Sequence, residues 1–331
     1  MASRSEVPDS VRLVLPMTSS SDEWDVELSP GRITTNIVAL YGFGALVLVL
    51  PYFVGPFQRG FWCDDETIRY EFKQNTVSAS ALFGFAIVVA LATTFWGEFV
   101  VQSWIEKRRK RYRLRNRSIH SLLVHILREF GYSQLGFITV LCLMQSTKFL
   151  IGRLRPHFLA VCEIENLEQL CDKDHKFIPV GQYKCSATST KAVHEARLSF
   201  FSGHSAISVY AAFYAILYLQ AKLGRYEPTK IFVSLAQTML MCISLAICYT
   251  RITDNWHHWS DVLVGIFVGM GVAIWTAVFW ARLFSDDTTV PPALPVYKAQ
   301  ERPMRPNDSG NTSGIDSMHD DSPRQPGQLR L

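Results

Sequence analysis

Long uncharged apolar runs alternate with short, densely charged segments along the chain of 331 residues. Each run approaches the roughly 20 apolar residues that an α-helix needs to cross a bilayer. The pattern therefore predicts six spans, at residues 33–56, 76–101, 121–150, 205–221, 231–250 and 262–284. We expect an all-α integral membrane protein, folded as a bundle of six transmembrane helices, in which Gly265 and Gly269 offer a close-packing face.

The two ends of the chain lack this apolar pattern. Residues 1–32 are rich in Ser, Asp and Glu, and they do not contain the apolar core of a cleavable signal peptide. Residues 285–331 are rich in Asp, Ser, Pro and Gly, a composition that cannot bury much apolar surface. We expect a disordered cytosolic arm at 1–32, a six-span membrane domain at 33–284 and a disordered cytosolic tail at 285–331.

A cluster of eight Lys and Arg residues between residues 107 and 117 determines the expected topology. Cytosolic loops carry an excess of such residues, so this loop is placed in the cytosol. Counting the spans from it puts both ends of the chain inside and the connections 57–75, 151–200 and 251–261 outside. The net charge of +4 gives no indication of nucleic-acid binding, because the basic residues are concentrated in this one loop.

Three polar clusters stand out against the apolar background, and the expected topology places all three on the outer side. One follows the third span, one begins the fourth span, and one fills the connection 251–261 between the last two spans. Charged residues this close to membrane spans are rare and usually functional. We therefore expect an active site at the outer ends of helices 3 to 6.

These residue types are suited to phosphate chemistry. Fixed cations neutralise phosphoryl oxygens, and arginine adds paired donors that match their geometry. A Ser-Gly turn at the start of a helix offers backbone N–H groups to an anion. One histidine can attack phosphorus while a second protonates the leaving oxygen. If the chain is helical there, Asp261 lies on the same helix face as His257 and can orient its ring, and the scheme requires no metal or other cofactor.

The order and spacing of these residues resemble a known family. The three clusters contain, in order, Lys148-x6-Arg155-Pro156, Ser202-Gly203-His204 and Arg251-x5-His257-x3-Asp261. This pattern resembles the signature of the type 2 phosphatidic acid phosphatase superfamily, and residues 61–69, 151–159, 197–204 and 257–262 resemble its animal lipid phosphate phosphatase branch. The resemblance covers roughly residues 33–284. Phe201 and Thr250 stand where the general pattern has proline and serine.

The resemblance implies that His257 is the nucleophile that forms a phosphohistidine, that Asp261 supports it, and that His204 is the general acid. It implies that five residues hold the phosphoryl oxygens: Lys148, Arg155, Ser202, Gly203 and Arg251. It further implies a magnesium-independent enzyme that hydrolyses phosphatidate, lysophosphatidate, sphingosine 1-phosphate or ceramide 1-phosphate. Its partners are then the lipid bilayer and these phospholipid and sphingolipid phosphates, its site is extracellular or lumenal, and the plasma membrane is the expected location.

Several alternatives stay open at this point. The same chemistry would serve a soluble sugar phosphate or a diphosphate lipid, and a non-catalytic lipid-binding scaffold or a transporter could share the spans. The sequence does not define the physiological substrate or the oligomeric state, and a homo-oligomer is possible. Arg153 is as compatible with a membrane-surface anchor as with a functional role.

The seven cysteines fall into two groups. Cys142, Cys242 and Cys248 lie within spans and are expected to be small apolar residues. The other four fall in outer connections, where one or two disulfides can form but their pairing is open: Cys63, Cys162, Cys171 and Cys185. The glycosylation sequons, at Asn116, Asn307 and Asn311, all fall on the expected inner side, so the outer connections have no acceptor.

Overall fold

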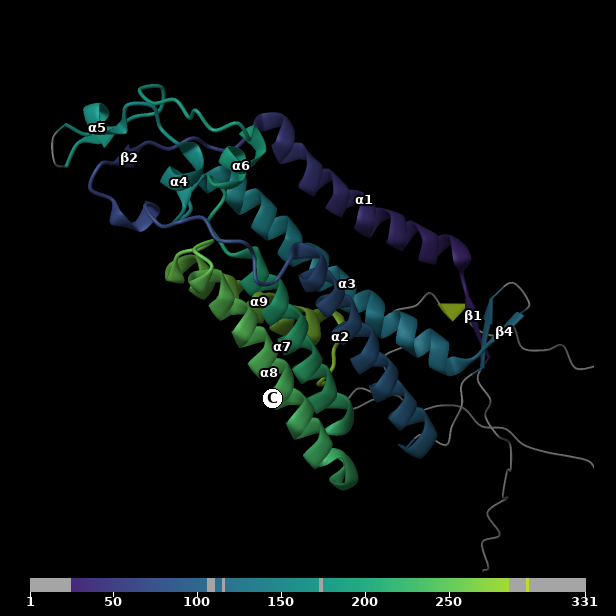
Figure 1. Ribbon diagram of the computed structural model, residues 1–331. Helices are drawn as coiled ribbons and strands as arrows, with labels where there is room; N and C mark the ends of the chain where they lie inside the picture. The colour runs from purple at the N-terminus through teal and green to yellow at the C-terminus, as the bar shows by residue number, and fades with distance from the viewer. Residues whose placement is uncertain (1–24, 106–110, 115–116, 173–174, 286–295, 298–331) are drawn as a thin grey trace, which may run out of the picture. The chain divides into compact units, whose positions relative to one another are not determined.

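The computed structural model describes residues 25–105, 111–114, 117–172, 175–285 and 296–297 (Figure 1). Most of the predicted arm and tail, and residues 107–110 and 115 of the basic cluster, lie outside these described residues. All three expected glycosylation sequons have their asparagine outside them as well.

Six long apolar helices dominate the described part of the chain, and they confirm the predicted membrane-bundle fold class. They are α1 (Pro30–Val54), α2 (Ala79–Val100), α3 (Ser121–Ile151), α7 (Gly203–Leu223), α8 (Lys230–Thr253) and α9 (Trp259–Trp275). The π-helical turns η2 (Val101–Ile105) and η4 (Thr276–Trp280) extend α2 and α9. Each helix begins or ends within a few residues of the predicted span.

Helix α7 is the most buried of the six helices and packs against α2, α3, α8 and α9. Its contact with α9 is close because two glycines of α9 face it. A Cβ at Gly265 would lie 2.7 Å from the carbonyl oxygen of Ser202, and one at Gly269 would lie 2.5 Å from that of Ala206. The close-packing face expected from the sequence is therefore used, and no larger residue fits there.

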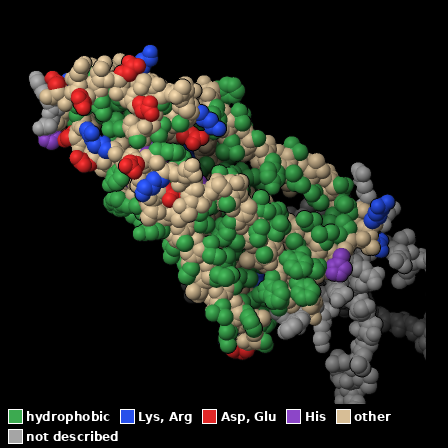
Figure 2. All heavy atoms as spheres, viewed as in Figure 1, with side chains coloured by type: hydrophobic (Ala, Val, Ile, Leu, Met, Phe, Trp, Pro, Cys, Tyr) green, Lys and Arg blue, Asp and Glu red, His purple; other side chains and the backbone are tan. Residues whose placement is uncertain are grey.

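The outward faces of the helices are apolar. Large hydrophobic side chains such as Phe43 and Phe53 of α1 and Phe232 of α8 are more than half exposed, and Figure 2 shows hydrophobic side chains covering the visible face of the long helices. A soluble protein rarely exposes so large an apolar surface. Length, composition and exposure together indicate a multi-pass membrane protein.

The connections 57–75 and 152–200 form a folded layer at one end of the bundle, which we call the cap (Figure 1). It contains the paired strands β2 (Phe61–Trp62) and β5 (Phe177–Ile178), the 3-10 turn η1 (Glu66–Ile68), and the short helices α4 (Phe158–Cys162), α5 (Leu167–Leu170) and α6 (Thr190–Glu195). The cap has its own apolar core, which includes Phe61, Ile68 and Phe158. The sequence analysis identified these segments only as outer connections, and it did not predict that they fold together.

Two disulfides hold the cap together. Cys63 pairs with Cys171, and Cys162 pairs with Cys185. These are the four cysteines expected in outer connections, and the structure supplies the pairing that the sequence left open. The first disulfide joins the two cap segments across 108 residues of chain, so it fixes how the first connection lies on the second.

A small sheet lies at the other end of the bundle. Its strand order is β4 (Arg117–Ile119), β3 (Arg111–Leu114), β1 (Asp25–Leu28) and β6 (Val296–Tyr297). Strands β1 and β6 fall within the predicted arm and tail, and β3 and β4 belong to the basic loop. Strands of two to four residues are too short to be recognised from alternation in a sequence. The sheet joins three segments that the sequence placed on one side of the membrane.

A buried ionic network connects α2, α3 and α7 near this sheet. Lys222 Nζ lies 2.9 Å from Glu98 and 3.4 Å from Glu129, and Arg128 lies 2.7 Å from Glu129. His125 lies beside Glu98 and completes the group. Two cations balance two carboxylates, so these residues join the three helices. The charged residues of α3, Arg128 and Glu129, are therefore explained by ion pairing and need not indicate a transporter.

Gly152 ends α3 and directs the chain into the cap. Its φ is +57° and its ψ is 36°, a left-handed conformation that favours glycine. A Cβ at this position would lie 1.7 Å from the carbonyl oxygen of Phe57. Because Arg153 and Arg155 follow directly, this one residue determines where both arginines lie.

We expect Gly152→Ala to lower the melting temperature of the purified protein by about 5 °C or more, because both the φ angle and the contact with Phe57 oppose a side chain. Gly84→Ala in α2 is the matched control, since a Cβ at Gly84 meets nothing within 4 Å. Equal melting temperatures for the two variants would contradict this account of the turn.

Replacing both Cys63 and Cys171 by serine should destabilise the protein by about 2–5 kcal/mol, because the cap loses its long-range crosslink. Thermal unfolding in detergent measures the loss. Cys242→Ser, which alters an exposed free cysteine, should leave the transition unchanged. Peptide mapping under non-reducing conditions checks the pairing directly, and a Cys63–Cys162 peptide would contradict it.

Candidate active site

The three predicted motifs meet where the cap joins the bundle. The backbone N–H of Ser202 donates to the carbonyl of Asp261 (3.1 Å), and that of Ser199 donates to the carbonyl of Arg153 (2.9 Å). His257 lies within electrostatic range of Lys148 and Arg155, and His204 within range of Lys148, Arg155 and Arg251. The structure thus brings together all the residues that the sequence analysis had selected.

Arg155 carries buried donors without partners. Its side chain is 6% exposed, and within the described part of the chain Nε and Nη1 have no hydrogen-bond acceptor. Burial lowers the pKa of Arg155 to about 10, so the guanidinium stays charged near neutral pH. An uncompensated buried cation is costly, and a bound anion would relieve that cost.

Trp256 fixes the position of this guanidinium. The Arg155 Cζ lies 4.5 Å from the centroid of the Trp256 ring, a cation–π distance. Trp256 Nε1 donates to the carbonyl of Lys73 (2.9 Å), and the rings of Phe72 and His157 pack against it. Nothing in the sequence identified Trp256 as part of the site, because an aromatic residue at a helix end has many other uses.

Ser202 and Gly203 form the start of α7. Ser202 is the N-cap, and its hydroxyl accepts hydrogen bonds from the backbone and hydroxyl of Ser205. A Cβ at Gly203 would lie 2.2 Å from Met144 Sδ and 3.8 Å from Lys148 Nζ, so the helix start lies directly against the end of α3. The free N–H groups of this first turn, with the helix dipole, favour an anion beside Lys148.

His204 is held by the segment that precedes α2. Its Nε2 lies 3.0 Å from the carbonyl of Val77, which assigns a proton to Nε2 and leaves Nδ1 as the second functional nitrogen. The residue therefore depends on the segment that leads from the cap into α2, as well as on α7.

Arg251 is buried, and four hydrogen bonds engage its guanidinium. Its guanidinium donates to Asp254 Oδ2 (2.9 Å), Asn75 Oδ1 (2.8 Å) and the Thr250 hydroxyl (2.9 and 3.1 Å). The threonine that departs from the family pattern thus provides the hydroxyl oxygen that a serine would also offer. Asn75 and Asp254 are partners that sequence reasoning missed, since neither belongs to the motif.

His257 is buried, 4% exposed, and its Nδ1 lies 2.7 Å from the carbonyl of Ser199. The proton is assigned to Nδ1, so Nε2 carries the lone pair. Burial lowers the pKa of His257 from 6.5 to about 3, opposed by Asp261. The ring is therefore neutral at physiological pH. In the unfolded chain the His257 ring binds a second proton more tightly than it does in the folded protein. The neutral ring therefore contributes fully to the free energy of unfolding above pH 6.5, and this contribution is lost as the pH falls toward 3.

The contact between His257 and Asp261 differs from the expected one. Helix α9 begins at Trp259, so the two residues do not share a helix face, and His257 Nδ1 lies 3.9 Å from Asp261 Oδ2. This distance permits electrostatic support but exceeds a hydrogen bond. The backbone carbonyl of Ser199 orients the ring instead, a role that no sequence pattern reveals.

Asp261 has other partners. Its carboxylate accepts hydrogen bonds from the Ser199 hydroxyl (2.6 Å), the His258 backbone N–H (3.1 Å) and Arg153 Nη1. His258 is the N-cap of α9, and its Nδ1 also lies 3.2 Å from Asp261. Arg153 is thus a partner of the buried carboxylate, which decides between the two interpretations that the sequence left open for it.

Comparison with known proteins agrees with this arrangement. Residues 130–285 match the model of the PAP2 superfamily. The chain is 42% identical over 247 residues to the Caenorhabditis elegans protein named phospholipid phosphatase homolog 1.2 homolog, covering 74% of this chain and 72% of that one. It is 32% identical to rat phospholipid phosphatase 2, over 73% of this chain and 84% of the relative.

A third relative gives the same result. Human phospholipid phosphatase 2 is 32% identical over 75% of this chain and 81% of its own length. No solved structure matches the chain. With six apolar helices, the three motifs gathered at one end of them, and similarity that extends over most of each relative, the chain belongs to the PAP2 superfamily of phosphatases.

Proposed function

We propose that this protein is a magnesium-independent lipid phosphate phosphatase that hydrolyses phosphatidate, lysophosphatidate, sphingosine 1-phosphate or ceramide 1-phosphate through a phosphohistidine. The observation that carries this proposal is the meeting of a neutral, buried His257 with the unpaired donors of Arg155 at the end of a membrane bundle. The names of the relatives, which are phospholipid phosphatases, support the lipid class.

The phosphate group would bind between α3 and α7. Arg155 Nε and Nη1 and Lys148 would neutralise its oxygens, and the first N–H groups of α7 at Gly203 would donate hydrogen bonds to it from the other side. Arg251 would act at longer range, because its donors already bind Asp254, Asn75 and Thr250. Its charge would still add to the positive field around the phosphate.

In the first step, the lone pair of His257 Nε2 would form a bond to phosphorus. The bond from phosphorus to the lipid oxygen breaks, and that oxygen takes a proton from His204. The attacking ring gains positive charge, which the carbonyl of Ser199 and the carboxylate of Asp261 stabilise. The bound dianion favours the protonated form of His204 that this step needs, and Nδ1 would deliver the proton because Val77 holds Nε2.

In the second step, His204 would accept a proton from water as the water oxygen attacks phosphorus. The phosphorus–nitrogen bond breaks, and its electron pair returns to His257, which becomes neutral again. Inorganic phosphate leaves, and the proton that His204 gained replaces the one it gave to the lipid alcohol. The cycle therefore balances in atoms and protons with only water consumed.

Two independent features support an outward orientation of the site. The disulfides lie in the cap, and disulfides persist in oxidising compartments. Arg111, Arg113 and Arg117, the described residues of the basic cluster, belong to strands β3 and β4 of the sheet at the other end, and the positive-inside rule would place such residues in the cytosol. We therefore place the site on the extracellular or lumenal side, most simply of the plasma membrane, with 33–284 as the membrane domain and both ends of the chain cytosolic.

The alternative functions are less well supported. A scaffold without activity would not need an uncompensated buried arginine beside a neutral histidine. A soluble sugar phosphate does not require a site at the ends of apolar helices, whereas a lipid can reach this position while its acyl chains stay in the bilayer. Comparing hydrolysis of short soluble and long-chain phosphates, including diphosphate lipids, separates these substrate classes.

Purified protein in detergent should release phosphate from phosphatidate in the presence of EDTA. His257→Ala should reduce kcat by more than about 10³-fold because the nucleophile is lost. His258→Asn is the matched control, since asparagine retains an N-cap for α9 and the variant should keep most of the activity. Equal loss in the two variants, or full activity in His257→Ala, would refute the assignment of the nucleophile.

Trp256→Ala should raise KM by roughly tenfold, because the cation–π contact that positions Arg155 is removed. Trp256→Phe should restore most of the affinity, since a ring remains under the guanidinium. Trp259→Ala, which removes an indole that is 69% exposed on the same connection, should leave KM unchanged. A loss confined to kcat in Trp256→Ala would contradict a binding role.

A further inference from the structure

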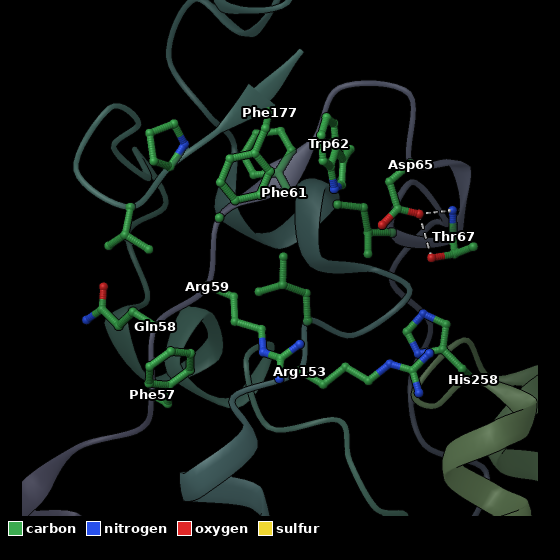
Figure 3. Close-up of a pocket in the computed structure, with 15 residues that line it drawn as sticks. Phe57, Gln58, Arg59, Phe61, Trp62, Asp65, Thr67, Arg153, Phe177 and His258 are labelled. Atoms are coloured by element: carbon green, nitrogen blue, oxygen red, sulfur yellow. Dashed lines mark hydrogen bonds between the residues drawn. The ribbon is translucent and has the colours of Figure 1, made fainter. Parts of the chain in front are cut away.

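A cavity lies in the cap beside the proposed catalytic cluster. Its volume is about 580 Å³. Figure 3 shows the side chains of Arg59, Arg153 and His258 along one side of it, and those of Trp62 and Phe177 along the other. Arg153 and His258 both contact Asp261, but none of the residues that we place around the reacting phosphate lines this cavity.

The polar side of the cavity has unused hydrogen-bonding groups. Arg59 Nε donates to the carbonyl of Ile151 (2.6 Å), and Arg153 Nη1 donates to the Ser260 hydroxyl and to Asp261. The other guanidinium nitrogens of both arginines have no acceptor among the residues that the structure describes. His258 is 10% exposed, and over the same described residues its Nε2 is buried without a partner.

These groups define the chemistry of an occupant. Two guanidiniums that face one cavity match the oxygens of a phosphate. His258 Nδ1 lies 3.2 Å from a carboxylate oxygen, so the proton is assigned to Nδ1, and Nε2 is an acceptor. A ligand that satisfies all three side chains therefore carries a phosphate anion and a hydrogen-bond donor, a role that a hydroxyl group can fill.

The rim of the cavity indicates where the occupant comes from. Phe57, Trp62 and Phe177 are 59%, 52% and 46% exposed. Phe57 follows the end of α1 by three residues, and its N–H donates to the carbonyl of Phe149 in the last turn of α3, so this part of the rim lies level with the ends of two membrane helices. Exposed aromatic residues at this level are typical of the membrane–water interface.

We propose that this cavity binds the head group of a second, non-substrate membrane lipid: a hydroxyl-bearing anionic phospholipid of the inositol or glycerol type. The phosphodiester lies against Arg59 and Arg153, a head-group hydroxyl donates to His258 Nε2, and the aromatic rim contacts the glycerol and upper acyl region. A phosphodiester is not a substrate for a monoesterase, so this site is distinct from the proposed reaction and is measured by binding alone.

The test uses the full-length protein in an uncharged detergent and equilibrium binding of radiolabelled phosphatidylinositol. Wild type should bind it at least about tenfold more tightly than phosphatidylmethanol, which has the same net charge and no hydrogen-bond donor on its head group. Arg59→Gln should weaken binding about tenfold. Lys184→Gln, which removes an exposed cap cation that does not line the cavity, should bind within about twofold of wild type.

Trp62→Ala provides a second variant that does not depend on the bond from Arg59 to Ile151. It should weaken binding of the lipid but not of glycerophosphoinositol, the water-soluble head group. Equal binding of the two phospholipids, or unchanged binding in Arg59→Gln, would overturn the proposal. Equal affinity for lipid and soluble head group would overturn the lipid assignment. His257→Ala should bind as wild type does, so loss of hydrolysis and loss of this site are separate outcomes.

Discussion

The site depends on a cation that is buried without a partner. Arg155 lies in a layer where its charge is poorly solvated, and Trp256 holds it there by its ring face, while two of its donors have no acceptor among the described residues. Burying such a charge costs free energy, and a bound anion would offset that cost. In the function that we propose, the folded protein holds these donors in place before the substrate binds, as in a preorganised site.

Buried charges are paired differently at the two ends of the bundle. Near the small sheet, Lys222 and Arg128 are balanced by Glu98 and Glu129, so the network is neutral and joins three helices. Near the cap, no carboxylate among the described residues forms a hydrogen bond with Lys148 or Arg155, and Glu195 and Asp261 act on these two cations only electrostatically. The same residue types are paired at one end of the bundle and left with unpaired donors at the other, so their pairing distinguishes the two ends, not their identity.

Asp261 connects three chain segments at the cap end of the bundle. Its carboxylate accepts hydrogen bonds from the Ser199 hydroxyl, from the backbone N–H of His258 and from Arg153. These donors lie in the segments before α7, before α9 and before α4, so Asp261 connects the three segments. Through Ser199 it also influences His257, whose Nδ1 is held by the carbonyl of that serine. A carboxylate with this many donors stays ionised, and the carbonyl of Ser199, whose hydroxyl it binds, keeps the His257 imidazole in one tautomer.

The sequence by itself determined the six spans, because a 20-residue apolar run has few alternatives to a membrane helix. It also selected the residues of the candidate site, since the three motifs have fixed internal spacing. Only the tertiary structure decided the cysteine pairing, the folded cap, the strands at both ends, and the roles of Arg153, Ser199, Asn75 and Trp256. These features depend on contacts between segments far apart in the chain, often through backbone carbonyls, and a carbonyl leaves no signal in a sequence.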